Sequence, residues 1–456
     1  MEKYTRQRST SMKIIGIDIG TTSISIVLIS LPEGTLLQAV TLPNDTFLPT
    51  AHPWERLQDP AAILTKVLPA LDGLLSACSD VAAIGLTGQM HGIVYLNNAG
   101  SPVSPLFTWQ DGRGNLPDYD NGKSVCSCMD EGYGIKLATG YGLATHLYNL
   151  KKGLVPTDAA SFCTIADYVG MALTGRGAPL LHISQAASLG LYDSKANDFM
   201  RDIITENGIP LDFLPAVTKE TVSLGSFRGI PASVSIGDNQ ASFMGAVGED
   251  RDSVLVNIGT GSQISVLSHS FFQGKGIEAR PFTADSYLLA GAALCGGSAY
   301  AALERFFREY VVAAGGADMP QYDIMKELLD GQGDPEESWS VHTTFLGTRE
   351  NPEETGSASG IRLDNFRPAA LIRGVLNGMA EELYGLYRIV QSETALSPAR
   401  LIASGNGVRK NGALQNILRN RFGMPLTIVA HQEEAAYGAA LTAASLMKGN
   451  NSFFRL

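Results

Sequence analysis

Two short Gly-Thr segments, each flanked by β-branched apolar residues, lie about half the chain apart. The first, DIGTT at 18–22, stands between apolar runs at 13–17 and 24–29. The second, NIGTG at 257–261, stands between runs at 253–256 and 264–267. Each pattern predicts strand, tight turn, strand, because glycine permits turn geometry and close backbone approach while Thr hydroxyls and amides bind oxygens. The repetition predicts two similar lobes that close on one polyphosphate.

Length and charge limit the function classes. The chain has 456 residues, enough for two to three domains with substantial cores. Its net charge of −11 argues against nucleic acid or an anionic membrane surface as a partner. An acidic protein can still bind ATP, because loop amides and Mg²⁺ supply a local positive field.

The cysteines and the first residues bear on the compartment. Five scattered cysteines do not suggest a disulfide framework, so we expect a reducing, cytoplasmic environment. Cys126 and Cys128 lack a second cysteine pair, which argues against a metal site. Residues 1–11 are polar and are expected to be a disordered leader, not a signal peptide. No apolar run reaches eighteen residues, so a membrane span is not expected.

Apolar periodicity gives a coarse map of the elements. Helices are predicted around 60–68, 368–392 and 433–440, and buried strands at 81–86, 232–236 and 399–404. Gly- and Asp-rich composition predicts a surface excursion at 112–134 and an irregular insertion at 315–360. The boundary between the two halves is placed near Gly248.

Two other nucleotide motifs can be excluded. A Walker loop would need glycine where Pro117 stands, five residues before the Gly122-Lys123-Ser124 segment. A dinucleotide fingerprint starting at Gly405 would need glycine where Lys410 stands. The phosphate-binding chemistry is therefore assigned to the two Gly-Thr loops.

Asp18 ends a buried strand directly before the first loop, where an unpaired carboxylate is costly. A Mg²⁺ that also contacts the phosphates would satisfy it. The alternative is that Asp18 accepts hydrogen bonds from the turn amides.

Asp238 follows the buried run at 232–236, with Gly237 between them. In phosphoryl transfer to an alcohol, a carboxylate accepts the hydroxyl proton, so Asp238 is the candidate general base. The alternative is a helix N-cap before residues 240–244.

Residues suited to binding a polyol follow the strand at 81–86 and recur about twenty positions later. They supply donors, acceptors and one aromatic face, and they are Gln89, His91, Trp109, Gln110, Asp111 and Arg113. His91 taken alone is more often a structural residue. The cluster as a whole predicts a sugar site.

Five segments, in this order, resemble the FGGY family of carbohydrate kinases over residues 12–448. They are 18–23, 237–240, 257–261, 404–407 and 434–440. The resemblance implies an α/β fold of two ribonuclease-H-like (actin-like ATPase) lobes, with ATP and Mg²⁺ in an interlobe cleft. It implies an N-terminal lobe at 12–248 and a C-terminal lobe at 249–450.

The resemblance also implies roles for single residues. Asp238 is the catalytic base and Asp18 the metal ligand. The residues implied to bind ATP are Gly20, Thr21, Thr22, Ser23, Gly259, Thr260, Gly405, Asn406 and Asn411. The residues implied to bind sugar are Gln89, Met90, His91, Trp109, Gln110, Asp111, Arg113 and Asn239.

Two segments bear on the sugar. Residues 89–92 resemble the ketose kinases of the family, while WQDGR at 109–113 and the segment 143–151 resemble members that act on sedoheptulose. Xylulose is the alternative substrate, and a homodimer is a possible assembly. A non-catalytic sugar-binding protein on a kinase scaffold is the alternative of another class, against which both aspartates and both loops argue.

Overall fold

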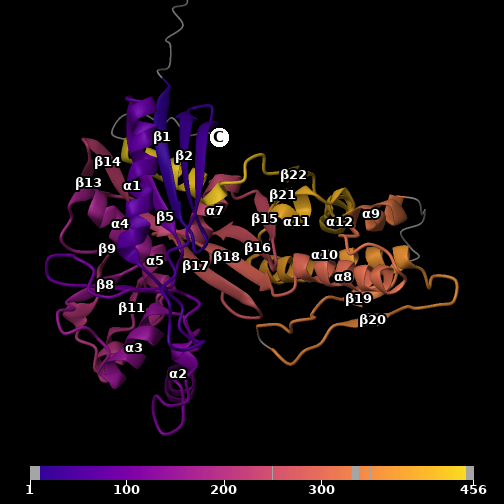
Figure 1. Ribbon diagram of the computed structural model, residues 1–456, viewed down its shortest axis with the longest axis horizontal. Coiled ribbons are helices and arrows are strands. Elements are labelled where there is room, and N and C mark those ends of the chain that lie inside the picture. Colours follow the sequence, from indigo (N-terminus) through magenta and orange to yellow (C-terminus); the bar gives the residue numbers. More distant parts are fainter. Residues whose placement is uncertain (1–10, 249, 331–337, 350, 448–456) are drawn as a thin grey trace, which may run out of the picture. The chain divides into compact units, whose positions relative to one another are not determined.

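The computed structural model describes residues 11–248, 250–330, 338–349 and 351–447 (Figure 1). The leader expected at 1–11 lies outside these residues, apart from Ser11. The chain divides into two compact units: unit 1 is Met1–Gly248, Pro281–Asp285 and Glu433–Leu456, and unit 2 is Glu249–Arg280 and Ser286–Gln432.

Unit 1 is built on a six-stranded sheet in the order β13-β14-β5-β1-β2-β3. The β1–β2 and β2–β3 pairs are antiparallel, whereas β5 pairs in parallel with both β1 and β14. The strands are β1 (Met12–Ile19), β2 (Ser23–Leu31), β3 (Thr35–Pro43), β5 (Val81–Gly88), β13 (Ser223–Phe227) and β14 (Ile230–Gly237).

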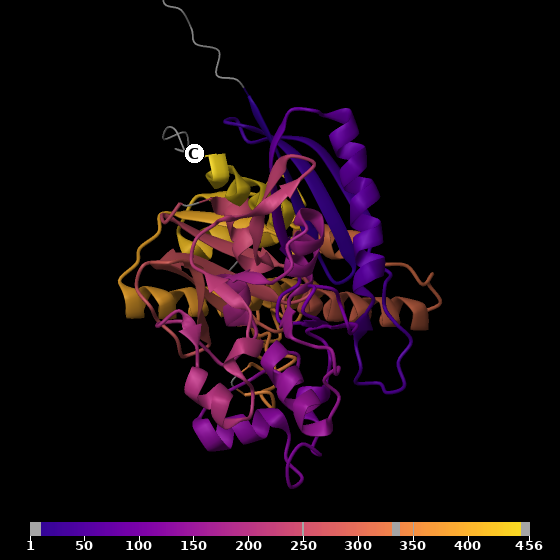
Figure 2. The same cartoon turned by 90° about the vertical axis from the view of Figure 1, so that its left-hand side faces the viewer.

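Successive side chains of β1 lie on opposite faces of this sheet. Ile15, Ile17 and Ile19 enter the larger core together with α1 (Pro60–Ala77), which runs along the sheet in Figure 2. Among the described residues, α1 is also the one helix long and apolar enough to span a membrane, but its Ile63, Val67 and Leu71 are fully buried in this core. It therefore packs as a core helix.

The other face of β1 contacts α13 (Glu434–Ala443). Ile14 packs against Ala436 and Ala440, and a Cβ on Gly16 would lie 1.8 Å from the Ala436 carbonyl oxygen. Because α13 lies on β1, β5 and α7, this C-terminal segment groups with unit 1. The packing therefore divides the chain differently from the expected lobe at 249–450.

The rest of unit 1 consists of short helices and two-stranded ribbons. The helices are α2 (Val125–Tyr133), α3 (Gly142–Lys152), α4 (Ile165–Thr174), α5 (Ile183–Ser188), α6 (Arg201–Glu206) and α7 (Asp238–Val247), with 3₁₀ turns η1 (Arg113–Asn115), η2 (Leu211–Phe213) and η4 (Ala444–Met447). The ribbons pair β4 (Leu57–Gln58) with β7 (Leu106–Phe107), β6 (Val94–Leu96) with β8 (Ser161–Cys163), β9 (Leu180–His182) with β12 (Ala216–Thr218), and β10 (Tyr192–Asp193) with β11 (Asp198–Phe199).

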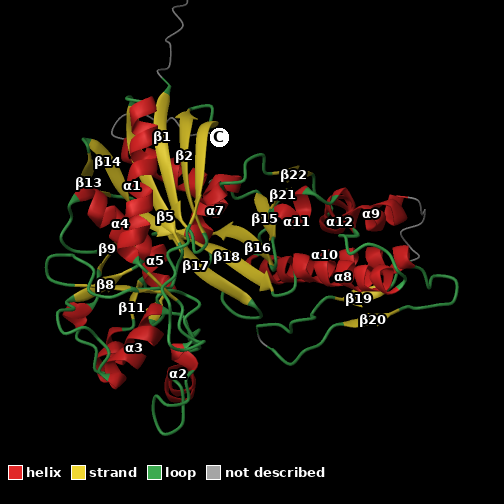
Figure 3. Ribbon diagram, in the orientation of Figure 1, coloured by secondary structure: helices red, strands yellow, loops and turns green. Residues whose placement is uncertain are grey.

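The surface excursion predicted at 112–134 contains a helix that its composition did not indicate. Helix α2 occupies its second half (Figure 3), begins at an N-cap formed by Ser124, and buries Val125 and Met129 one turn apart. That spacing is too short to reveal a helix within a Gly- and Ser-rich sequence.

Unit 2 repeats the central strand pairing of unit 1. Its sheet runs β17-β18-β16-β15-β21-β22, and β15 pairs antiparallel with β16 and parallel with β21, as β1 pairs with β2 and β5. The strands are β15 (Ser253–Ile258), β16 (Ser262–Ser268), β17 (Ile277–Thr283), β18 (Ser286–Ala293), β21 (Arg400–Ser404) and β22 (Leu426–Ile428). The two Gly-Thr loops thus join equivalent strands, as the repeated motif predicted.

Helices complete unit 2, and α10 carries much of its core. They are α8 (Gly297–Ala313), α9 (Tyr322–Asp330), α10 (Pro368–Thr394), α11 (Asn406–Arg409) and α12 (Gly412–Phe422). The stretch 315–360 is less irregular than expected, since it contains α9 and the ribbon of β19 (Ser340–His342) with β20 (Ser357–Ser359). Residues 331–337 and 350 of that stretch lie outside the described residues.

Candidate active site

We call the first Gly-Thr loop loop 1 (residues 20–22). Each backbone carbonyl from Ile19 to Thr22 accepts a hydrogen bond from another part of the protein. The four hydrogen bonds are Gln89 N to Ile19 O (2.9 Å), Asn44 Nδ2 to Gly20 O (2.7 Å), Gln58 Nε2 to Thr21 O (3.0 Å) and Asn44 N to Thr22 O (2.9 Å). Within the described residues, the backbone amides of the loop have no acceptor. These amides are therefore available to an anion, as in other phosphate-binding turns.

The second loop (loop 2, residues 259–261) is held by the start of α8. The amides of Gly297 and Ser298 donate to the carbonyls of Gly259 and Thr260 at 2.9 and 3.0 Å. A Cβ on Gly297 would lie 2.5 Å from the Gly259 carbonyl oxygen, so glycine is required for this approach.

Asp18 and Asp238 lie at the same edge of the unit 1 sheet. Asp18 pairs with Thr87 of β5, and Gly237, directly before Asp238, pairs with Gly88 of β5. The carboxyl ends of parallel strands form the usual ligand-binding edge of an α/β sheet.

The surroundings of Asp18 disfavour its charge. Burial, together with the negative charges of Asp238 and Glu433, raises the pKa of Asp18 to about 7. Its Oδ1 is buried and has no hydrogen-bond partner within the described residues. The alternative in which the turn amides satisfy Asp18 is therefore not observed, and an orphaned carboxylate oxygen fits a cation.

The same described residues hold no group of three His, Cys, Asp or Glu side chains arranged for a metal ion. Mg²⁺ commonly binds proteins through only one or two carboxylates and completes its shell with water and substrate phosphates.

Asp238 is the first residue of α7 and not its N-cap. The N-cap is Gly237, and no side chain caps the helix there. Asn239 Nδ2 donates to Asp238 Oδ1 at 2.8 Å and to Met90 Sδ at 3.6 Å. The three predicted site residues therefore lie in contact.

A buried polar network fixes β14 behind Asp238. Ser184 Oγ accepts from Gly237 N at 2.9 Å, and Ser235 Oγ donates to Asp167 Oδ1 at 2.5 Å. Burial raises the pKa of Asp167 to about 7. These residues lay outside the sequence prediction, since nothing local marks them as neighbours of the site.

Trp109 and Gln89, two of the predicted sugar residues, contact loop 1 directly. Trp109 Nε1 donates to Thr21 Oγ1 at 2.9 Å, and Thr21 Oγ1 donates to Gln89 Oε1 at 3.3 Å. The Trp109 side chain is 46% exposed, so its face is accessible. The structure thus joins a predicted phosphate residue to two predicted sugar residues.

His91 is held in a left-handed backbone conformation with a φ of 74°. Its ring stacks on Tyr141 with centroids 4.6 Å apart, and its Nδ1 lies 2.7 Å from the Ser188 carbonyl oxygen. A non-glycine residue in this region of φ is uncommon and often accompanies a functional constraint.

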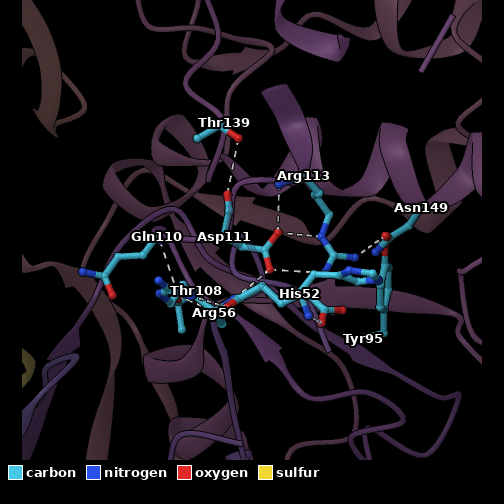
Figure 4. A network of polar contacts seen from close by, with 10 residues as sticks. His52, Arg56, Tyr95, Thr108, Gln110, Asp111, Arg113, Thr139 and Asn149 are labelled. Atoms are coloured by element: carbon cyan, nitrogen blue, oxygen red, sulfur yellow. Dashed lines mark hydrogen bonds and ion pairs between the residues drawn. The ribbon is translucent and has the colours of Figure 1, made fainter. Parts of the chain in front are cut away.

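Asp111 and Arg113 are buried against each other (Figure 4). Arg113 donates from Nε to Asp111 Oδ1 at 2.6 Å, from Nη2 to Asp111 Oδ2 at 3.2 Å, and from Nη1 to Asn149 Oδ1 at 2.5 Å. Asp111 Oδ2 also accepts from Arg56 N at 3.1 Å. Each charge of this pair is therefore neutralised within the protein. Gln110, by contrast, is exposed and points away from Asp111 in Figure 4.

Unit 2 contains a cavity of about 1800 Å³. Five of the residues predicted to bind ATP line it, namely Gly259, Thr260, Gly405, Asn406 and Asn411. Gly405 has a φ of +92°, and a Cβ there would lie 2.4 Å from the Ile258 carbonyl oxygen. The other residues predicted to bind ATP, 20–23, belong to unit 1.

The cavity has aromatic and charged walls that sequence reasoning missed. Tyr300 stacks on Tyr322 with centroids 5.7 Å apart, and burial raises the pKa of Tyr300 to about 12. Lys326, Arg373 and Arg421 also line it. None of them carries a local motif, so only the fold places them together.

Two α/β units with Gly-Thr loops between equivalent strands are typical of the actin-like ATPase fold. In unit 1, carboxylates also lie at the strand ends. Family models confirm and narrow this fold class. Residues 13–248 match the N-terminal domain, and residues 254–447 the C-terminal domain, of the FGGY family of carbohydrate kinases. The chain belongs to this family and is a carbohydrate kinase, an enzyme class that uses ATP as phosphate donor.

Several curated relatives extend over nearly the whole chain. It is 27% identical to the sedoheptulokinase of Mus musculus and 26% identical to that of Homo sapiens, over 94% of this chain and 96% of each relative. It is 22% identical to the xylulose kinase of Staphylococcus xylosus, over 96% of this chain and 92% of that protein.

Solved structures confirm the fold. The xylulose kinase of Rhodospirillum rubrum superposes with a TM-score of 0.81 at 22% identity, covering 96% of this chain and 91% of that one. The gluconate kinase of Lactobacillus acidophilus gives 0.81 at 20% identity, with coverages of 97% and 91%.

Proposed function

We propose that the protein transfers the γ-phosphoryl group of ATP to a ketose, with sedoheptulose as the preferred acceptor and sedoheptulose 7-phosphate as the product. The observation that carries the proposal is the strand-end pair Asp18 and Asp238 beside a loop whose carbonyls are all bound and whose amides have no acceptor within the described residues. Similarity to two sedoheptulokinases over 94% of the chain supports the choice of sugar.

Asp238 acts as the general base in this proposal. Its carboxylate takes the proton of the sugar hydroxyl as that oxygen forms a bond to the γ-phosphorus and the bond from phosphorus to the ADP oxygen breaks. Asn239, which donates to Asp238 Oδ1, orients the carboxylate. Such a base contributes about 10² to 10⁴ in rate.

The nucleotide is bound by both loops. Residues 20–23 and Gly259 with Thr260 bind phosphate oxygens, while Gly405, Asn406 and Asn411 bind the adenosine in the unit 2 cavity. Asp18 holds Mg²⁺, directly or through water, and that ion neutralises phosphate charge when bound.

The residues that bind the sugar are Gln89, Met90, His91, Trp109, Gln110 and Asn239. Asp111 and Arg113 serve the site indirectly, because their buried pair fixes the segment that presents Trp109 and Gln110. Exposed Trp109 offers its ring to the C–H face of the sugar.

A coupled assay for ADP, with mass spectrometry of the product, tests the proposal on sedoheptulose, xylulose, gluconate and glycerol. Sedoheptulose should give the highest kcat/KM, because a site of buried polar groups discriminates by about 1–3 kcal/mol for each partner left unpaired. A higher value for xylulose would transfer the assignment to xylulose phosphorylation. Sugar binding without turnover on any acceptor would favour the non-catalytic alternative.

A further inference from the structure

Gln58 is a fully buried amide whose two ends contact both halves of the proposed site in unit 1. Its Nε2 donates to the Thr21 carbonyl at 3.0 Å, and its Oε1 accepts from Gln89 Nε2 at 2.9 Å. The amide thus connects the backbone of loop 1 to a side chain assigned to the sugar. No sequence motif identified Gln58.

The ribbon that carries Gln58 also carries Trp109 near its other strand. Gln58 of β4 pairs with Leu106 of β7, and Trp109 follows β7 by two residues. Thr21 is therefore held by the same ribbon at two atoms, its carbonyl by Gln58 and its hydroxyl by Trp109.

The Thr21 hydroxyl makes hydrogen bonds to two residues that are proposed to bind the sugar. It accepts from Trp109 Nε1 at 2.9 Å and donates to Gln89 Oε1 at 3.3 Å, a longer bond. A sugar hydroxyl that engages Gln89 or Trp109 competes for these contacts and frees the Thr21 hydroxyl for a phosphate oxygen. The bond from Gln58 keeps the Thr21 peptide in place during that exchange, so the loop amides stay aimed at the phosphates.

We infer that Gln58 is a positioning residue that couples sugar binding to phosphate binding at loop 1. The inference rests on the proposed function. It means that each ligand strengthens binding of the other, and that Gln58 carries this mutual effect although it contacts neither ligand. By thermodynamic linkage, the factor by which the nucleotide changes the affinity for the sugar equals the factor by which the sugar changes the affinity for the nucleotide.

Titration calorimetry on the full chain measures this factor directly. The dissociation constant of sedoheptulose is determined with and without saturating AMP-PNP and Mg²⁺, for the wild type and for Gln58→Met. Met fills a similar volume but cannot donate or accept at these positions. The wild type should show a coupling factor of at least about fivefold, the lower end of typical values, and Gln58→Met should fall to within about twofold of unity.

Asn44→Ala is the matched control. Asn44 holds loop 1 through Gly20 O and, within the described residues, makes no hydrogen bond to Gln89 or Trp109. Its substitution should weaken AMP-PNP binding but keep the wild-type coupling factor. Equal loss of coupling in both variants would mean that general loop damage, and not the Gln58 connection, is responsible, and would overturn the inference.

Gln58→Glu provides a second variant that keeps the side chain's shape. When protonated, its carboxyl can accept from Gln89 and donate to Thr21 O; when ionised, it cannot donate. Coupling in this variant should therefore approach the wild-type value at low pH and be lost at high pH. The wild type, measured at each pH, is the reference for pH effects that do not come from the substitution.

Two further outcomes would overturn the inference: wild-type coupling near unity, or wild-type coupling retained in Gln58→Met. If Gln58→Met does not fold, a pH-independent coupling factor in Gln58→Glu decides against the inference. The proposed function is tested separately by wild-type turnover, which does not depend on any Gln58 result.

Discussion

Asp18 and Asp238 stand at the ends of two parallel strands that flank β5, and the charge of Asp238 contributes to raising the pKa of Asp18 to about 7. On β1 the side chain of Asp18 shares the face of Ile14 and Gly16, which is the face that α13 covers. The negative charge of Glu433 also contributes to raising the pKa of Asp18. Two carboxylates in different surroundings are suited to different tasks, which in the proposed function are cation binding and proton transfer.

Asp18→Asn should make the metal-free protein more stable and less active. The substitution removes a carboxylate whose Oδ1 is buried and unpartnered within the described residues, so the free energy of unfolding at pH 8 in EDTA should rise by about 1–2 kcal/mol. Urea unfolding and kcat, measured on the same preparation, check both parts. Lower stability together with unchanged kcat would contradict the metal-site assignment.

Asp111→Ala should destabilise the protein by about 3–5 kcal/mol, because it leaves the buried Arg113 guanidinium uncompensated. The double variant Asp111→Leu with Arg113→Met should recover much of that loss, since no charge is then buried. Urea unfolding of the single and double variants gives the comparison. If Asp111→Ala kept wild-type stability and lost only sugar affinity, Asp111 would be a direct sugar ligand after all.

Gly405→Ala should raise the dissociation constant of ATP by tenfold or more. The φ of +92° is unfavourable for alanine, and the added Cβ would press on the Ile258 carbonyl directly before loop 2. Gly385→Ala is the control, because it lies in helix α10, does not line the cavity, and has no heavy atom within 4 Å of the added Cβ. Equal ATP affinity in both variants would argue against the nucleotide site in unit 2.

Acid should destabilise the protein partly through His146. Burial lowers the pKa of His146 to about 4, and its Nδ1 lies 2.8 Å from the Tyr95 hydroxyl. The folded state therefore holds the neutral ring, while the unfolded chain takes up a proton near pH 6.5. The stability from this group is present above pH 6.5 and is lost as the pH falls toward 4, by on the order of 3 kcal/mol.

His146→Phe separates this contribution from other acid effects. Phenylalanine keeps the stacking on Phe213, where the ring centroids lie 4.9 Å apart, but cannot take a proton. The variant should be less stable than the wild type at pH 7.5, and the gap should narrow at pH 4.5. If the difference in urea midpoint between the two proteins were the same at both pH values, the result would count against a neutral buried His146.

The sequence predicted those parts of the site that are encoded locally. The two strands and the Gly-Thr turn between them are adjacent in the chain. A carboxylate directly after an apolar strand can also be recognised from the sequence alone as a candidate site residue. The confirmed hairpins β1–β2 and β15–β16 follow from such patterns. The family motifs added the expected roles of residues around Gly405, which the structure places on one cavity.

What the sequence could not predict depends on partners far along the chain. Gln58 lies 37 residues from Thr21, and Arg113 binds Asn149 across 36 residues. Arg113 lies only two residues from Asp111, but the two residue types alone do not show that their side chains pair with each other. Residue type alone does not distinguish Asp18, whose Oδ1 has no hydrogen-bond partner within the described residues, from Asp111, whose carboxylate is paired with Arg113.

The most direct test of the account is the turnover of Asp238→Asn with sedoheptulose, measured beside its sugar affinity. Asparagine keeps the shape of the side chain but cannot accept the hydroxyl proton, so kcat should fall by about 10² to 10⁴. The dissociation constant of the sugar, measured by calorimetry, should stay within about tenfold of the wild type, and Tm should show that the variant is folded. A folded Asp238→Asn variant with near wild-type kcat would contradict the assignment of Asp238 as the general base of a sugar kinase.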